Sequence, residues 1–150
     1  MANVLSQYGE QNGLVDFTQA ASGVAGILNG AKLYFYTNNI VPAEGTPLAS
    51  FDLSPDANLS AIVLTWGAAY RRAGGGIQRD AQAILAQLAS GANAGPLYGY
   101  IVELAAGAQW IYGEAFVGGP ITLTDTLDGF VLVPKFALGG GSFGEGSVIR

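Results

Sequence analysis

The sequence predicts an all-β fold, and three observations support this class. Short apolar segments rich in β-branched and aromatic residues recur along the chain, and such residues favour strands. Several of these segments alternate between apolar and polar or small residues, which is the period of a half-buried strand. Turns rich in glycine and proline separate the segments at intervals of about 8–15 residues, a spacing typical of compact antiparallel architectures.

The chain divides into three predicted parts. Residues 1–30 form an extended N-terminal arm, because they mix polar residues with isolated apolar ones and show no regular period. Residues 31–138 form the body, for which we expect a β-sandwich of jelly-roll or immunoglobulin-like type, or a small barrel. Residues 139–150 form a glycine-rich C-terminal tail. The length of 150 residues suits one domain with a substantial core.

The predicted strands of the body follow from their apolar faces. They cover residues 31–37, 59–66, 97–104, 109–117, 121–124 and 130–138, with a short edge strand at 51–53. Segments 97–104 and 109–117 are expected to pair as a hairpin across a tight connection. In the second of them, Trp110, Tyr112 and Phe116 are expected on one face.

Residues 80–89 carry two conflicting signals. Alanine, leucine and glutamine dominate the segment, and these residues favour a helix. The segment also alternates, with Gln82, Ile84, Ala86 and Leu88 on one side of a strand. The sequence therefore allows either one short helix or a strand over residues 80–89.

Composition excludes several classes of function. Only 11% of residues are charged, well below the usual level of about 25%, which favours a surface that contacts other subunits. The basic residues cluster only at Arg71, Arg72 and Arg79, too few to bind a phosphate backbone. Cysteine and histidine are absent, so thiolate and imidazole chemistry are too. The sequence contains no run of about 20 apolar residues, the length that a membrane span requires. We expect no nucleic acid, no membrane contact and no cofactor.

The candidate catalytic and metal sites have simpler interpretations. Glu103 and Glu114 face each other in the expected hairpin as a possible acid–base pair, but solvent-facing strand carboxylates are the preferred interpretation. Asp125 and Asp128 offer oxygens to a cation, but aspartates beside a glycine are ordinary turn residues. Residues 139–144 match a dinucleotide glycine pattern, yet no room remains for the helix it needs. We therefore predict no catalytic residue and no metal site.

Two surface features offer alternatives. The rings of Tyr34, Tyr36, Trp110 and Tyr112 form a sugar-binding platform if they are exposed together, although core packing is preferred. Arg71 and Arg72 beside Tyr70 present donors that suit a partner's carboxylates, although a solvated loop tip is preferred.

Several stretches together resemble a group of small structural proteins of tailed bacteriophages. They are Gly30-Ala31-Lys32-Leu33-Tyr34-Phe35-Tyr36-Thr37-Asn38-Asn39, Val41-Pro42, Leu64-Thr65-Trp66-Gly67, Tyr98-Gly99-Tyr100-Ile101-Val102, Gly113-Glu114-Ala115-Phe116 and Val131-Leu132-Val133-Pro134-Lys135-Phe136-Ala137-Leu138-Gly139, preceded by Val4-Leu5-Ser6-Gln7-Tyr8-Gly9-Glu10. The resemblance covers most of the chain and rests on hydrophobic strand motifs. It implies a virion component, most concretely a capsid decoration or cement protein made in the host cytoplasm and bound to the outer capsid surface.

That resemblance and the residues together give a mechanical hypothesis. The body is expected to form a homo-oligomer, with a trimer favoured, and to clamp the major capsid protein. The arm adds contacts across the shell, anchored by Val4, Leu5, Tyr8, Leu14 and Phe17. The alternative function is a tail-fibre or spike module that recognises host surface glycans.

Overall fold

The structure is a computed structural model that describes residues 4–6, 27–71, 73, 77–90 and 95–138. These residues form twelve strands, β1 to β12, and one short 3-10 helix at Leu48–Ser50. Within this part of the chain there is no α-helix. The predicted all-β class is confirmed, whereas the choice between a sandwich and a barrel stays a prediction. The expected 139–150 tail lies outside the described residues.

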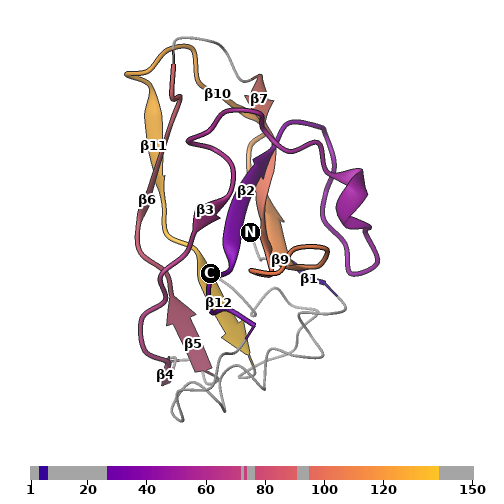
Figure 1. The fold of residues 1–150 in the computed structure, drawn as a ribbon, viewed down its shortest axis with the longest axis vertical. Coiled ribbons are helices and arrows are strands. Elements are labelled where there is room, and N and C mark those ends of the chain that lie inside the picture. Colours follow the sequence, from indigo (N-terminus) through magenta and orange to yellow (C-terminus); the bar gives the residue numbers. More distant parts are fainter. Residues whose placement is uncertain (1–3, 7–26, 72, 74–76, 91–94, 139–150) are drawn as a thin grey trace.

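One sheet contains five strands in the order β1-β9-β8-β2-β3 (Figure 1). Their bounds are Val4–Leu5 (β1), Trp110–Ala115 (β9), Gly99–Glu103 (β8), Lys32–Tyr36 (β2) and Ile62–Val63 (β3). The predicted hairpin is confirmed, because β8 pairs antiparallel with β9. All neighbours in this sheet are antiparallel.

A long antiparallel ladder lies opposite this sheet and is built from two strand pairs in series. β5 (Ile77–Asp80) pairs with β12 (Lys135–Leu138), and β6 (Ile84–Gln87) pairs with β11 (Gly129–Leu132). Between the pairs, residues 81–83 face the shorter stretch 133–134, so one strand bulges. At the ends of the ladder, β4 (Tyr70–Arg71) flanks β5, and β7 (Pro96–Leu97) pairs with β10 (Ile121–Thr122).

Residues 80–89 are extended and contain β6, so the helix alternative is wrong. Ile84, Ala86 and Leu88 are buried, while Leu85 between them is exposed. This alternation places the apolar side chains on the core only in an extended chain, so tertiary burial outweighs the helix propensity of alanine and leucine. Gln82, expected on the same side, is exposed.

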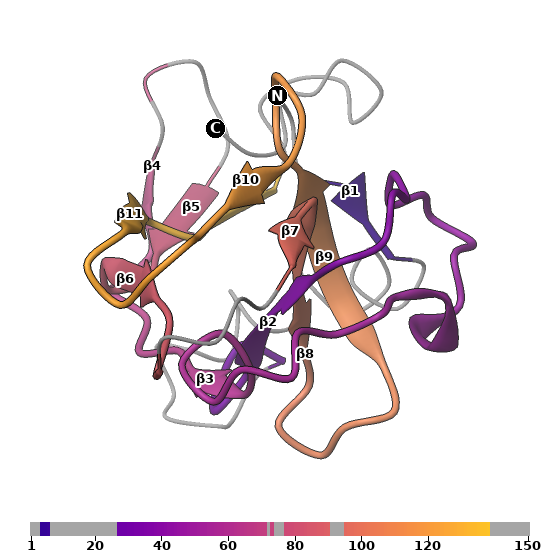
Figure 2. The ribbon, with the colours of Figure 1, turned by 90° about the horizontal axis from the view of Figure 1, so that it is seen from above.

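The main core fills the space between the sheet and the ladder (Figure 2). Phe35 of β2 meets Phe130 of β11 edge to face, with ring centroids 5.6 Å apart. Further along, Tyr112 of β9 packs on Phe136 of β12 at 5.5 Å. Such aromatic pairs hold the two layers together, because each ring buries a large apolar area.

A second apolar cluster covers the opposite face of the five-stranded sheet. It contains Tyr36, Phe51, Ile101 and Trp110. Trp110 reaches this face because β9 bulges against β8: Val102 pairs with Tyr112 but Glu103 pairs with Trp110, so Ile111 is the extra residue. The expectation that Trp110 and Tyr112 share a face is therefore wrong.

Candidate functional site

The most exposed apolar strand surface lies on the outer side of the ladder. Leu85 of β6 and Val131 of β11 are register partners, and the two residues are 57% and 66% exposed. Val133, in the short stretch between β11 and β12, is 41% exposed. We call Leu85, Val131 and Val133 the ladder face. Contiguous exposed apolar patches mark interaction surfaces in soluble proteins, so the ladder face is a candidate interaction surface.

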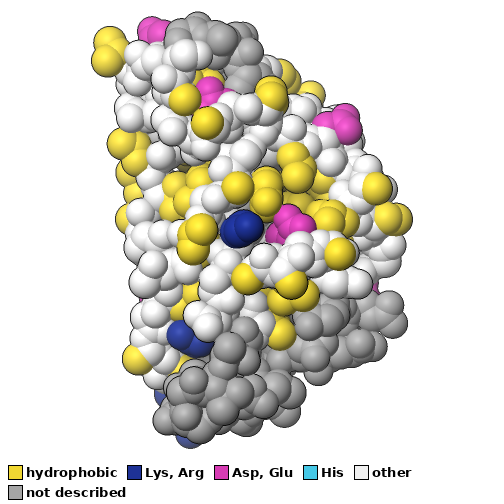
Figure 3. Space-filling model, in the orientation of Figure 1, with side chains coloured by type: hydrophobic (Ala, Val, Ile, Leu, Met, Phe, Trp, Pro, Cys, Tyr) yellow, Lys and Arg dark blue, Asp and Glu magenta, His cyan; other side chains and the backbone are white. Residues whose placement is uncertain are grey.

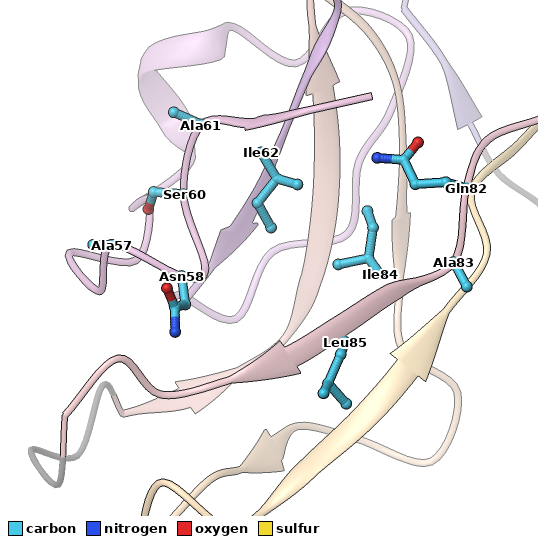
Figure 4. Close-up of a pocket in the computed structure, with 9 residues that line it drawn as sticks. All are labelled: Ala57, Asn58, Ser60, Ala61, Ile62, Gln82, Ala83, Ile84 and Leu85. Atoms are coloured by element: carbon cyan, nitrogen blue, oxygen red, sulfur yellow. The ribbon is translucent and has the colours of Figure 1, made fainter. Parts of the chain in front are cut away.

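A groove of about 480 Å³ adjoins the ladder face at Leu85. One wall is the turn region before β3 and the other is the start of β6 (Figure 4). Ile62 from the first wall and Ile84 from the second point toward each other across it. The residues that line it are Ala57, Asn58, Ser60, Ala61, Ile62, Gln82, Ala83, Ile84 and Leu85.

Hydrogen bonds tie the two walls of the groove together at both ends. At one end, the Gln82 side chain accepts from the Thr65 N–H at 2.6 Å and donates to the Val63 carbonyl at 3.2 Å. At the other end, the Asp56 carboxylate accepts from the Ala89 N–H at 3.1 Å. The groove is therefore preformed by the fold.

The lining of the groove offers adhesion and not acid–base chemistry. It contains no ionisable side chain. The Ser60 hydroxyl donates to the Ser54 carbonyl, and the Gln82 amide is used between the walls. The surface that lines the groove is mostly polar and includes Asn58, so small side chains and hydrogen-bonding groups remain to contact an occupant.

Glu103 and Glu114, the acid–base pair considered from the sequence, are separated by the sheet. Glu103 lies on the side of Ile101 and the second cluster, where its Oε1 accepts from the Ala108 N–H at 3.1 Å. Glu114 lies opposite Tyr100 on the main-core side, and its Oε2 accepts from the Tyr100 hydroxyl at 3.1 Å. Two carboxylates on opposite faces cannot act on one substrate.

Glu103 instead shapes a small polar cluster with Tyr34 and Lys32. Lys32 is its register partner on β2. Burial, the charge of Glu103 and a hydrogen bond to it raise the pKa of Tyr34 above the usual 10.0. The phenol is thus held neutral, which disfavours a role as nucleophile or base.

The four rings expected as an alternative sugar platform do not form one. Tyr36, Trp110 and Tyr112 are buried, and only Tyr34 of the four is partly exposed. Tyr112 also belongs to the main core, on the other face from Trp110. The fold therefore uses these aromatics for packing.

The two aspartates considered for a cation hold a turn. Asp125 Oδ1 accepts from the N–H groups of Leu127 and Asp128, and Asp128 Oδ2 accepts from the Thr124 N–H at 3.0 Å and from its hydroxyl. Within the described ranges, no group of three or more acidic, histidine or cysteine side chains is placed to hold a metal ion. Among the same residues, no helix is long and apolar enough to cross a bilayer.

Of the expected arm, the structure describes residues 4–6 and 27–30. Val4 and Leu5 form β1, which pairs with Gly113 and Tyr112 of β9. Ser6 then donates from its N–H to the Ile111 carbonyl at 2.8 Å and from its hydroxyl to the Trp110 carbonyl. Tyr8, Leu14 and Phe17 lie outside the described residues, so the anchoring role stays a prediction. Arg71, in β4, is exposed, and Arg72 also lies outside.

The ladder face was missed by the sequence analysis, although a signal for it exists. Residues 130–133 are four consecutive apolar residues, so any strand through them has apolar side chains on both faces. Phe130 and Leu132 fill the core side, which leaves Val131 and Val133 outward.

Comparison with known proteins gives no match: no family model, no curated protein and no solved structure is similar to this chain. The resemblance to phage structural proteins therefore stays a prediction that rests on the sequence motifs.

Proposed function

We propose that this chain is a structural protein that works by adhesion, and that the assembly it joins is a bacteriophage virion. Its role there is that of a decoration or cement protein on the outer surface of the major capsid shell. The observation that carries the adhesive part of the proposal is the ladder face, an apolar strand surface with an adjoining preformed groove. The virion and the capsid come from the resemblance of the sequence motifs.

The charge pattern supports adhesion over catalysis. The 150 residues contain six basic and eleven acidic side chains. Several carboxylates of the described residues, those of Asp56, Glu103, Glu114 and Asp128, accept hydrogen bonds from the chain itself. A groove with a mostly polar lining and no ionisable groups provides shape and hydrogen-bonding contact. Repeated many times on a symmetric shell, such modest contacts add up through avidity.

The N-terminal segment supplies the second contact in this proposal. β1 and Ser6 fix the start of the described chain to the edge of the five-stranded sheet. Apolar anchors such as Tyr8, Leu14 and Phe17 contribute roughly 1.5–3 kcal/mol each on burial, before the cost of ordering.

The decisive experiment locates the chain in particles. We expect mass spectrometry to find it in purified virions of its source, and cryo-electron microscopy to place it on the outside of the shell. Particles that lack the chain are expected to bind the added protein, and a variant without residues 1–17 is expected to stay folded and not to bind. Absence from virions, location in the tail, or full shell binding by the truncated variant would contradict the proposal.

A further inference from the structure

We infer that Asn29 and Gly30 form a site of spontaneous covalent modification, at which the side-chain amide of Asn29 is converted to a carboxylate in the folded protein. The chain itself supplies the nucleophile, and water is the co-reactant. The inference is independent of the proposed function, because it depends on the chemistry of one turn and not on a partner. Three features carry it: the position of Asn29, the surroundings of the Gly30 nitrogen, and the protection of comparable sites elsewhere.

Asn29 and Gly30 lie in the turn that precedes β2. The Ala31 N–H donates to the Leu28 carbonyl at 3.2 Å and closes this turn. Leu28 and Ala31 are fully buried, whereas Asn29 is exposed. The core therefore fixes both ends of the turn and leaves the Asn29 side chain in water.

The backbone nitrogen of Gly30 is the nucleophile of this site. Gly30 has a φ of 72°, which glycine adopts freely because it lacks a Cβ. The missing Cβ also leaves the nitrogen open to the preceding side chain. Within the described ranges, neither the Gly30 N–H nor the Asn29 side chain makes a hydrogen bond. No hydrogen bond must therefore break before the two groups meet.

The reaction replaces one bond by another and then consumes a water molecule. Gly30 loses its N–H proton, and the nitrogen attacks Cγ of Asn29. The new N–Cγ bond closes a succinimide ring, the Cγ–Nδ2 bond breaks, and Nδ2 leaves as ammonia after taking up a proton. Water then opens the ring. Hydrolysis at Cγ gives an aspartyl residue, and hydrolysis at the main-chain carbonyl gives an isoaspartyl residue, with nothing oxidised or reduced.

The other asparagines among the described residues are hindered. The Asn38 Nδ2 donates to the Ser50 carbonyl at 2.8 Å, and its Oδ1 accepts from the Asp52 N–H at 2.9 Å. These two bonds hold that amide in place. Asn39 and Asn58 are exposed, but an isoleucine and a leucine follow them, and these side chains crowd the attacking nitrogen.

Asp128 and Gly129 could form the same ring, but the fold protects them. The Asp128 carboxylate accepts from the Thr124 N–H at 3.0 Å and from the Thr124 hydroxyl. These bonds hold the pKa of Asp128 below the usual 3.8, and an ionised carboxylate resists a nucleophile. Gly129 is also a strand residue, paired with Gln87. The turn at Asn29 has neither form of protection.

The two products change the molecule in different ways. Both add a negative charge to a formal net charge of −5, and Figure 3 shows one face on which charged side chains are few and scattered. The isoaspartyl product also adds a carbon atom to the main chain, between the buried ends of the turn. Space there is limited, because a Cβ on Gly30 would lie 3.2 Å from the Ala105 Cβ. The isoaspartyl form should therefore be the less stable of the two.

Incubation of the folded full chain in mildly alkaline buffer tests the site. The chain carries Asn12→Gln, which removes the other asparagine–glycine pair. Anion-exchange chromatography separates the more acidic products, and mass spectrometry of proteolytic peptides locates the change. We expect Asn29 to react at least about tenfold faster than Asn39 and Asn58, a barrier lower by about 1.4 kcal/mol or more. The rate should rise with pH, because the nitrogen must lose its proton.

Asn29→Gln in the same background is the matched control, because its longer side chain closes a ring far more slowly. Circular dichroism confirms that this variant is folded. Acidic products that form equally fast in Asn29→Gln would overturn the site. So would faster reaction of Asn39 or Asn58, or an intact Asn29 in folded protein after the urea-unfolded chain has converted it.

Urea denaturation of the separated products tests the structural consequence. Asn29→Asp should unfold close to the wild-type midpoint, because an exposed substitution changes stability little. The isoaspartyl product should unfold at a clearly lower urea concentration than Asn29→Asp. Equal midpoints for these two forms would refute the constraint that the buried ends place on the turn. Finding the chain in virions, or not finding it, changes none of these expectations.

Discussion

The rings of Tyr100 and Tyr112 meet edge to face in the main core, with centroids 6.2 Å apart, but their hydroxyl groups have different environments. The Tyr100 hydroxyl donates to Glu114 at 3.1 Å. The Tyr112 hydroxyl is fully buried and has no hydrogen-bond partner among the described residues. Burial, with the charge of Glu114 added, raises the pKa of Tyr112 well above 10.0.

This difference predicts opposite effects for two identical substitutions. Tyr112→Phe should raise the free energy of unfolding by about 1 kcal/mol, because it removes an unpaired buried polar group. Tyr100→Phe should lower it by about 1–2 kcal/mol, because it leaves the Glu114 carboxylate short of a donor. Urea denaturation of both variants measures the two changes. A loss of stability in Tyr112→Phe would show that its hydroxyl has a partner.

Gly99 of β8 is required by close packing. A Cβ at this position would overlap the Glu114 carbonyl oxygen and the Tyr36 hydroxyl. Gly99→Ala should therefore cost about 2 kcal/mol or more through overpacking. Gly45→Ala is the control, because a Cβ there meets no atom within 4 Å. Thermal unfolding followed by circular dichroism compares the two variants, and equal melting temperatures would contradict the prediction.

Ala61 in the groove wall has a left-handed backbone, with φ of 53°. This conformation costs an alanine roughly 1–2 kcal/mol, whereas glycine adopts it freely. Ala61→Gly should therefore be neutral or stabilising, although glycine adds entropy to the unfolded chain. Ala57→Gly, in the same turn region and without a positive φ, should destabilise by about 0.5–1 kcal/mol. A larger loss in Ala61→Gly than in Ala57→Gly would refute the assigned strain.

We expect Asp128, in the turn that precedes β11, to make the stability of the fold depend on pH. The hydroxyl and the N–H of Thr124 hold the pKa of this carboxyl below the usual 3.8. A lowered pKa in the folded state stabilises the fold above pH 3.8, and this contribution is lost as the pH falls through the lowered value. Urea denaturation between about pH 5 and about pH 2 should show a shallower loss in Thr124→Val than in the wild type. Identical slopes would contradict the assignment.

Much of the fold follows from the alternation of apolar and polar residues in the sequence. Where the sequence-based prediction was wrong or undecided, the structure shows a physical reason. The 97–104 and 109–117 hairpin was predicted because apolar side chains recur at every second position. The face of Trp110 could not be predicted, because the bulge at Ile111 shifts the alternation by one residue. Residues 80–89 stayed ambiguous because helix formers occupy a strand whose partner, β11, lies far along the chain.

The candidate site was less predictable than the fold. The groove joins the segment 57–62 to the segment 82–85, and it exists because Gln82 and Asp56 bridge the two. Neither bridge has a local sequence signal. Val131 and Phe130 lie on opposite sides of the strand as neighbours must, but which side meets the core depends on the whole sheet arrangement.

β8 is buried along its entire length, because the main core covers one face and the cluster around Trp110 covers the other. β8 thus contributes side chains to both apolar clusters, one on each of its faces. Unfolding of either cluster would expose one face of β8 and destabilise the packing on its other face. The two clusters should therefore unfold in one step. A calorimetric scan of this protein should therefore show one transition, with equal calorimetric and van't Hoff enthalpies.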